Sequence, residues 1–214
     1  REELAVPKTF RDYNRVASFF TRGCNAASPT QYGSTVAIGN VVVSPSEFMP
    51  RLFAENGRLL DSQGRITLDT PEALRALENY RETYSYSDRT IYDFWKNALE
   101  GFADGTAAMT VVFINYASHI LNSQMSRIAG KLGFAPVPGG KPLLGGGVIG
   151  IAQSCTCPAA ACKFLEWLYA DLVAPVFTML GGLSPCRSAY SNRDISEQYP
   201  WLSTARKSFP TAQR

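Results

Sequence analysis

Three cysteines lie close together in the sequence, at a spacing that could support metal chemistry. Cys155-Thr-Cys157 is followed by Cys162. Thiolates can bind zinc, but zinc-binding pairs usually have about two to four intervening residues, and the single histidine, His119, is distant in the sequence. We therefore expect no metal site, and we predict that the thiols are buried or that one disulfide forms. Five cysteines in a chain of this size leave the redox compartment undecided.

Paired carboxylates could act as a general acid and a general base. One pair is Asp88 and Asp93, and another is Glu100 and Asp104. Polar residues surround both pairs, as is typical of solvated helix faces. A Ser/His/Asp site would require His119, and no Gly-x-Ser-x-Gly elbow surrounds any serine. We therefore expect that the protein is not an enzyme.

A run of glycines, 145–147, has the composition of a phosphate-binding loop. It does not match such a loop, because no Gly-x-Gly-x-x-Gly opens a helix and no Gly-Lys-Ser/Thr follows. A flexible crossing between two parts of the protein is the better interpretation. We expect no cofactor.

Composition excludes several classes of protein. The chain has 214 residues, of which 45% are hydrophobic, so it can bury a core. Its net charge is +3, and no run of Lys or Arg concentrates that charge, so nucleic acid is not an expected partner. The longest apolar stretch, 107–116, is far shorter than the ~20 residues that span a bilayer.

Hydrophobic periodicity and capping residues predict the elements that position these residues. Thr9 and Asp12 form the pattern of a capping box, and Thr70-Pro71 opens a later helix whose apolar face we predict from Leu74, Leu77, Tyr80 and Tyr84. We predict helices over 10–20, 44–57, 91–102, 116–125 and 159–179, a closing helix near 199–202, strands over 35–43, 107–114, 131–135 and 145–152, and a small hairpin or extended loop over 59–68. Strands that alternate with helices favour a layered α/β domain with a largely buried sheet.

Two short motifs resemble a known family. Val6-Pro-Lys-Thr-Phe-Arg-Asp-Tyr13 is similar to the family's helix opening, and Phe102-Ala-Asp-Gly-Thr-Ala-Ala-Met109 is similar to its Gly-x-Ala-Ala-Met strand. Together with Phe53–Gly57, the helix start at Asp69, Phe134–Gly139 and the glycine-rich strand at Gly145, they follow the family order over nearly the whole chain. The chain thus resembles the periplasmic-type extracellular solute-binding proteins of ABC importers, the sugar-binding family that includes maltose-binding protein.

The resemblance implies a two-lobed α/β fold of the periplasmic-binding-protein type II class, with layered helices around a mixed sheet. Residues 1–143 and 189–214 are expected to form the ligand-binding lobe 2, and 144–188 an excursion into an incomplete lobe 1. The resemblance also implies that the first part of lobe 1 precedes this chain and that the C-terminal helices are cut short.

Ligands of this family lie between the lobes, held by aromatic faces and a few polar groups. The loop after the Ala-Ala-Met strand usually supplies a Trp, but here it contains Phe113, Asn115 and Tyr116, which are our first candidates for ligand contacts. Phe113 is equally well interpreted as a core residue. The resemblance implies further candidate ligand contacts at Glu47, Tyr32, Asn40 and Gly146, the last by close approach of the backbone at the hinge. A helix-capping role would explain a glutamate at position 47 equally well.

These expectations favour an extracytoplasmic protein, periplasmic or lipid-anchored on the outer face of the membrane, that delivers a carbohydrate or similar polar solute to ABC permease subunits. A ligand-sensing or adhesion module on the same fold is the alternative. Because 145–186 would carry apolar side chains with no lobe 1 to cover them, we also expect this chain to self-associate.

Overall fold

The computed structural model describes residues 4–38, 43–90, 95–180, 182, 184–191 and 193–213. Its α-helices are α1 (Phe10–Phe19), α2 (Val43–Ala54), α3 (Pro71–Ser85), α4 (Trp95–Ala103), α5 (Ala117–Leu121), α6 (Pro158–Leu168), α7 (Ala174–Met179), α8 (Arg193–Gln198) and α9 (Pro200–Ser208). Short 3₁₀ turns lie at η1 (Ile114–Tyr116), η2 (Arg187–Tyr190) and η3 (Phe209–Thr211), and the strands are β1 (Tyr32–Ser34) and β2 (Ala107–Met109). None of the described helices is both long and apolar enough to cross a membrane.

Local capping signals place the helix starts correctly. The Thr9 side chain accepts a hydrogen bond from the Asp12 amide, and the Asp12 carboxylate accepts one from the Thr9 amide, which confirms the capping box of α1. Thr70 caps α3 in the same way through the Ala73 amide. Because these contacts lie within three residues, the sequence pattern suffices to predict them.

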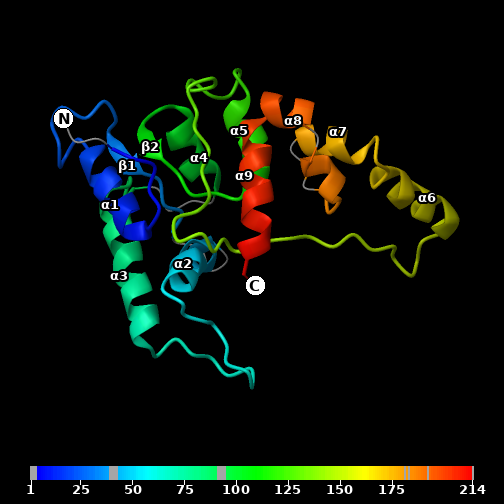
Figure 1. Ribbon diagram of the computed structural model, residues 1–214, viewed down its shortest axis with the longest axis horizontal. Helices are drawn as coiled ribbons and strands as arrows, with labels where there is room; N and C mark the ends of the chain where they lie inside the picture. Colours follow the sequence, from blue (N-terminus) through cyan, green and yellow to red (C-terminus); the bar gives the residue numbers. More distant parts are fainter. Residues whose placement is uncertain are drawn as a thin grey trace.

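The apolar face predicted for α3 is wrong for its two leucines, whereas Tyr80 is half-buried beside the Arg51 guanidinium. Leu74 and Leu77 are 58% and 54% exposed, whereas Ala73, Ala76 and Thr83 are buried. α3 lies against α1 and α2 (Figure 1), and small side chains on that face allow the helices to approach closely. The leucines consequently point away from the packed face.

The sheet is smaller than predicted. β1 and β2 pair in parallel, with Tyr32 opposite Ala107 and Ser34 opposite Met109. The strand predicted over 35–43 is wrong in its described part: β1 ends at Ser34, 35–38 are irregular, and 39–42 lie outside the described residues. Of the strand predicted over 107–114 only Ala107–Met109 forms, and 131–135 and 145–152 are irregular. The two described strands pair only in parallel, so the described part of the chain does not show the mixed sheet that the resemblance implies. Ala37 shows why strand pairing ends, because its backbone groups bond to side chains of α2 and α3.

Two predicted helices are also shorter than expected. We predicted a helix to residue 125, but α5 ends at Leu121. The Asn122 side chain accepts a hydrogen bond from the Gln124 amide at 2.9 Å, and this local turn takes the place of further helix. The helix predicted over 159–179 is divided into α6 and α7, and Pro175, which has no amide hydrogen, lies in the first turn of α7. The helix predicted from 91 is described from Trp95 onwards, as α4.

The C-terminal helices form their own hydrophobic cluster. Trp201 and Leu202 of α9 are buried against α5, α7 and η2, which confirms the predicted closing helix. In Figure 1, α9 lies near the centre of the molecule and the chain end lies below it. The predicted loop at 59–68 is confirmed as a small hairpin-like turn with one antiparallel bridge between Leu60 and Ile66.

An extended segment leaves this body after Leu144. Leu143 forms a parallel bridge with Gln213, and the segment that follows runs outward to α6 at the far end of the molecule (Figure 1). Val148, Phe164, Trp167 and Leu172 are all exposed along it. The stretch 144–180 therefore leaves several large apolar side chains exposed.

Candidate functional site

The carboxyl ends of β1 and β2 meet at one edge of the small sheet. The Thr35 amide donates to the Met109 carbonyl at 3.1 Å, and the Thr35 and Thr110 hydroxyls lie 2.7 Å apart. In open α/β folds, ligands bind beyond the carboxyl ends of the strands. We therefore take the loops that follow these two strands as the candidate site.

Phe113 lines two cavities at this edge. The larger one, about 330 Å³, is lined mainly by apolar side chains of 108–114 and 132–138. The smaller one, about 70 Å³, lies between Glu47, Phe113 and Leu143. Both are lined by Val111, Val112, Phe113 and Val137. The structure thus brings together two predicted site residues, Glu47 and Phe113, that are far apart in the sequence.

Phe113 also has packing contacts that do not involve a ligand. Its ring lies against the buried cluster of Ala37, Leu99 and Ile120, and a Cβ placed on Gly145 would come within 2.8 Å of the ring. A side chain at position 145 would therefore require the Phe113 ring to shift. The structure supports both interpretations of this residue, a core contact and a cavity wall.

Glu47 is engaged by the protein on both carboxylate oxygens. Oε1 accepts a hydrogen bond from the Ala37 amide at 3.3 Å, and Oε2 accepts one from Arg51 Nη1 at 3.2 Å. Burial raises the pKa of Glu47, and the charge of Arg51 counteracts only part of that shift. Glu47 is 4% exposed. These contacts give it a structural role beside the cavity.

The other predicted site residues are not all gathered at this edge. Asn115 is exposed on η1, and Tyr116 is half-buried beside the cluster that holds Phe113. Burial raises the pKa of Tyr116. Tyr32 lines a separate cavity of about 350 Å³ beside α4, together with Asp88, Glu100 and Asp104. Gly146 lies on the outgoing segment with no atom within 4 Å of a Cβ placed there. Asn40 lies outside the described residues.

Arg51 is a buried residue in contact with Glu47 that the sequence interpretation missed. Its guanidinium lies over the rings of Phe10 and Tyr80, at 4.6 Å and 5.1 Å from their centroids. A Glu and an Arg four residues apart on a helix form a recognisable ion-pair spacing, and this signal could have identified Arg51.

The cysteine prediction is wrong in part. All five cysteines are free thiols, and Cys24, Cys157 and Cys162 are exposed, so no disulfide forms and these three thiols are not buried. Among the residues that the structure describes, no group of three or more His, Cys, Asp or Glu side chains is arranged to hold a metal ion.

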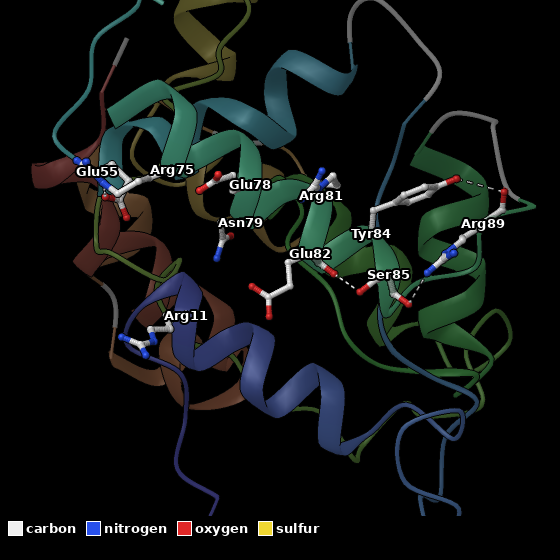
Figure 2. A pocket seen from close by; sticks show the side chains of 10 residues that line it. All are labelled: Arg11, Glu55, Arg75, Glu78, Asn79, Arg81, Glu82, Tyr84, Ser85 and Arg89. Atoms are coloured by element: carbon white, nitrogen blue, oxygen red, sulfur yellow. Dashed lines mark hydrogen bonds and ion pairs between the residues drawn. The ribbon is translucent and has the colours of Figure 1, made fainter. Parts of the chain in front are cut away.

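A wide polar groove of about 760 Å³ lies elsewhere, between α1 and α3 (Figure 2). Arg11 comes from α1, and Asn79 and Glu82 come from the facing side of α3. Several of its charged groups already pair with one another or with nearby residues: Arg75 with Glu55 and Glu72, and Glu82 with Asn14. Since the groove contains both signs of charge and none of our predicted site residues, we do not assign the solute site to it.

Comparison with known proteins shows that the chain matches the model of one protein family. The model of the family described as "Bacterial extracellular solute-binding protein" matches residues 2–204. A protein of Sinorhizobium fredii described as a probable amino-acid ABC transporter periplasmic-binding protein is 21% identical over 199 residues, which cover 92% of this chain and 44% of that protein.

Two solved structures have the same fold. A solute-binding protein from Agrobacterium radiobacter K84 in complex with ribitol has a TM-score of 0.79 and 22% identity, with coverage of 98% of this chain and 54% of that one. Maltose-bound MalE3 of T. maritima has a TM-score of 0.81 and 24% identity, with coverage of 98% and 55%. The expected periplasmic-binding-protein fold is thus confirmed, and the chain spans about half the length of these relatives.

Proposed function

This chain belongs to the bacterial extracellular solute-binding protein family, and we propose that it takes part in capturing a carbohydrate or similar small polar solute for an ABC importer. The observation that carries the proposal is the edge where β1 and β2 end. There an aromatic residue, Phe113, lines two cavities, and Thr35, Thr110 and Asn115 supply polar groups on the same two loops. Aromatic faces with a few polar groups suit a hydroxylated solute.

We propose that two lobes enclose the solute. Residues 1–143 and 189–214 form the ligand-binding lobe, and 144–188 belong to the other lobe. The bridge between Leu143 and Gln213 supports a pivot at this point, because the chain is fixed to the body up to Leu144 and exposed beyond it. Closure about this pivot would trap the solute without any chemical step.

Partners and location follow from the same proposal. The protein works outside the cytoplasm and delivers its solute to the permease subunits of an ABC importer. Ribitol and maltose, the ligands of two proteins with this fold, guide the choice of solute class, and the amino-acid description of the Sinorhizobium fredii protein provides a competing class to test.

The test is a thermal-shift screen with polyols, sugars and amino acids, followed by calorimetry on each compound that raises the melting temperature. We expect a polyol or sugar to bind and to be recovered unchanged by mass spectrometry. Conversion of the bound compound to product would contradict a transport function. Binding of amino acids alone would replace the proposed solute class.

A further inference from the structure

Arg51 is a charged residue in an almost fully buried position. Its side chain is 2% exposed, one turn beyond Glu47 on α2 and between the rings of Phe10 and Tyr80. Removing a guanidinium from water is costly unless hydrogen bonds and an opposite charge compensate for it. The contacts of Arg51 therefore indicate what its burial achieves.

Arg51 connects three helices at one point. Nη1 donates to the Glu47 carboxylate and to the Glu47 carbonyl oxygen, and Nη2 donates to the Thr83 hydroxyl of α3 at 3.3 Å. Thr83 in turn donates to Asn14 Oδ1 of α1 at 2.6 Å. Arg51 Nε has no hydrogen-bond partner among the described residues. The guanidinium is thus held firmly, although not all of its donors are satisfied.

The opposite end of this network reaches the candidate site. Glu47 Oε1 accepts the Ala37 amide, and the Ala37 carbonyl accepts the Tyr80 hydroxyl at 3.3 Å. Both polar groups of the Ala37 backbone are therefore held by side chains of α2 and α3. Ala37 lies three residues after the end of β1 and two residues after Thr35, whose hydroxyl contacts Thr110 of the neighbouring loop.

Stability alone does not account for this pair. Replacing a buried ion pair by apolar side chains of similar size is often neutral or stabilising, because the desolvation cost can exceed the attraction. The partly unsatisfied guanidinium adds to that cost. What the pair supplies here is a defined position for the Ala37 backbone, which packing alone would hold less precisely.

We propose that Arg51 is a positioning residue: it holds the Glu47 carboxylate, which fixes the Ala37 backbone and so shapes the loop after β1 at the solute site. The identity of that site as a solute site rests on the proposed function. The positioning of Ala37 by Arg51 does not, and it can be tested without a ligand.

The experiment compares Arg51→Met with Arg75→Met, a matched change at a surface arginine of α3 that pairs with Glu55 and Glu72. Amide hydrogen exchange is measured at Ala37 and at core amides of α2 and α3. We expect exchange at Ala37 to accelerate at least about tenfold more than at the core amides in Arg51→Met, and not in Arg75→Met. A uniform change across all amides, or no change at Ala37, would overturn the proposal.

A second variant covers the case in which Arg51→Met fails to fold. The double variant Glu47→Gln/Arg51→Met removes both charges and keeps an acceptor at position 47. If Arg51 positions that acceptor, Ala37 still exchanges faster than in the unmodified protein. If Ala37 stays protected, Arg51 has no positioning role.

Calorimetry with ribitol as the probe tests the link to the solute. We expect Arg51→Met to weaken ribitol binding about tenfold and Arg75→Met to leave it unchanged. Absence of ribitol binding to the unmodified protein would count against the polyol assignment, while the exchange at Ala37 would still decide the role of Arg51. Accelerated exchange with unchanged ribitol affinity would show that the loop after β1 does not shape the site.

Discussion

The hydroxyls of Thr35 and Thr110 lie 2.7 Å apart and join the loops that follow β1 and β2. The Thr35 amide also bonds to the Met109 carbonyl, so the two loops are connected through backbone and side chain. This contact fixes the spacing of the two segments that carry Ala37 and Phe113. It is therefore a direct point at which to perturb the candidate site.

Thr35→Val should lower the free energy of unfolding by about 0.5–1.5 kcal/mol, the usual net contribution of one hydrogen bond. Thr110→Val should have a similar effect, and the double variant should cost less than the sum because both changes remove the same contact. Urea unfolding measures all three. Thr211→Val, at an exposed C-terminal turn, is the control. Strict additivity would show that the two hydroxyls do not interact.

Tyr116→Ala should weaken solute binding by about 1–3 kcal/mol if the half-buried ring contacts the solute. The reason is the loss of aromatic area beside the cavity edge. Calorimetry with the compound found in the solute screen measures the effect. Tyr84→Ala on α3 serves as the control, since Tyr84 lines the polar groove. An unchanged dissociation constant would remove Tyr116 from the site.

The capping box of α1 should make stability depend on acidic pH. Hydrogen bonds from Thr9, its side chain foremost, hold the pKa of Asp12 below its usual 3.8. Because the pKa is lower in the folded state, the stabilisation is present above pH 3.8 and is lost as pH falls through the lowered value.

Asp12→Asn should accordingly lower the urea midpoint at neutral pH, and the difference from the unmodified protein should shrink well below pH 3.8. In a Thr9→Ala background, which itself costs about 1 kcal/mol, the same change should have little further effect. A difference that stays constant with pH would mean that the Asp12 charge does not contribute.

The exposed segment 144–180 should make this chain self-associate. Val148 and Leu172 are fully or largely exposed, and Leu180 is also exposed on the same stretch. Soluble monomers rarely leave a large contiguous apolar patch uncovered. We expect light scattering to show dimers or larger species, through this face or through exchange of 145–186 between copies, with the glycines at 145–147 as the hinge.

The matched variants for this prediction are Val148→Asp/Leu172→Asp on the segment and Ile66→Asp on the exposed loop near α3. The first should shift the protein towards monomer, and the second should not. A monomer at every concentration of the unmodified chain would contradict the prediction.

Helix starts could be predicted from the sequence because the contacts that set them are local. Thr9 bonds to Asp12, and Thr70 bonds to Ala73, within one turn of the chain. The closing helix with Trp201 and Leu202 follows in the same way from local spacing of apolar residues. The order of short motifs from Val6–Tyr13 through Phe102–Met109 to the glycine-rich segment at Gly145 likewise indicated the family, which the family match confirms.

Tertiary structure decided how far the strands extend, which face of α3 is buried, and what surrounds Glu47. The β-branched run after Ser34 favours a strand in isolation, yet Ala37 bonds to Glu47 and Tyr80 instead of a neighbouring strand. Leu74 and Leu77 favour a buried face, but α1 and α2 approach α3 where its side chains are small. Sequence period specifies which residues share a face, but the choice of face depends on partners that are distant in the chain, and only their packing determines it.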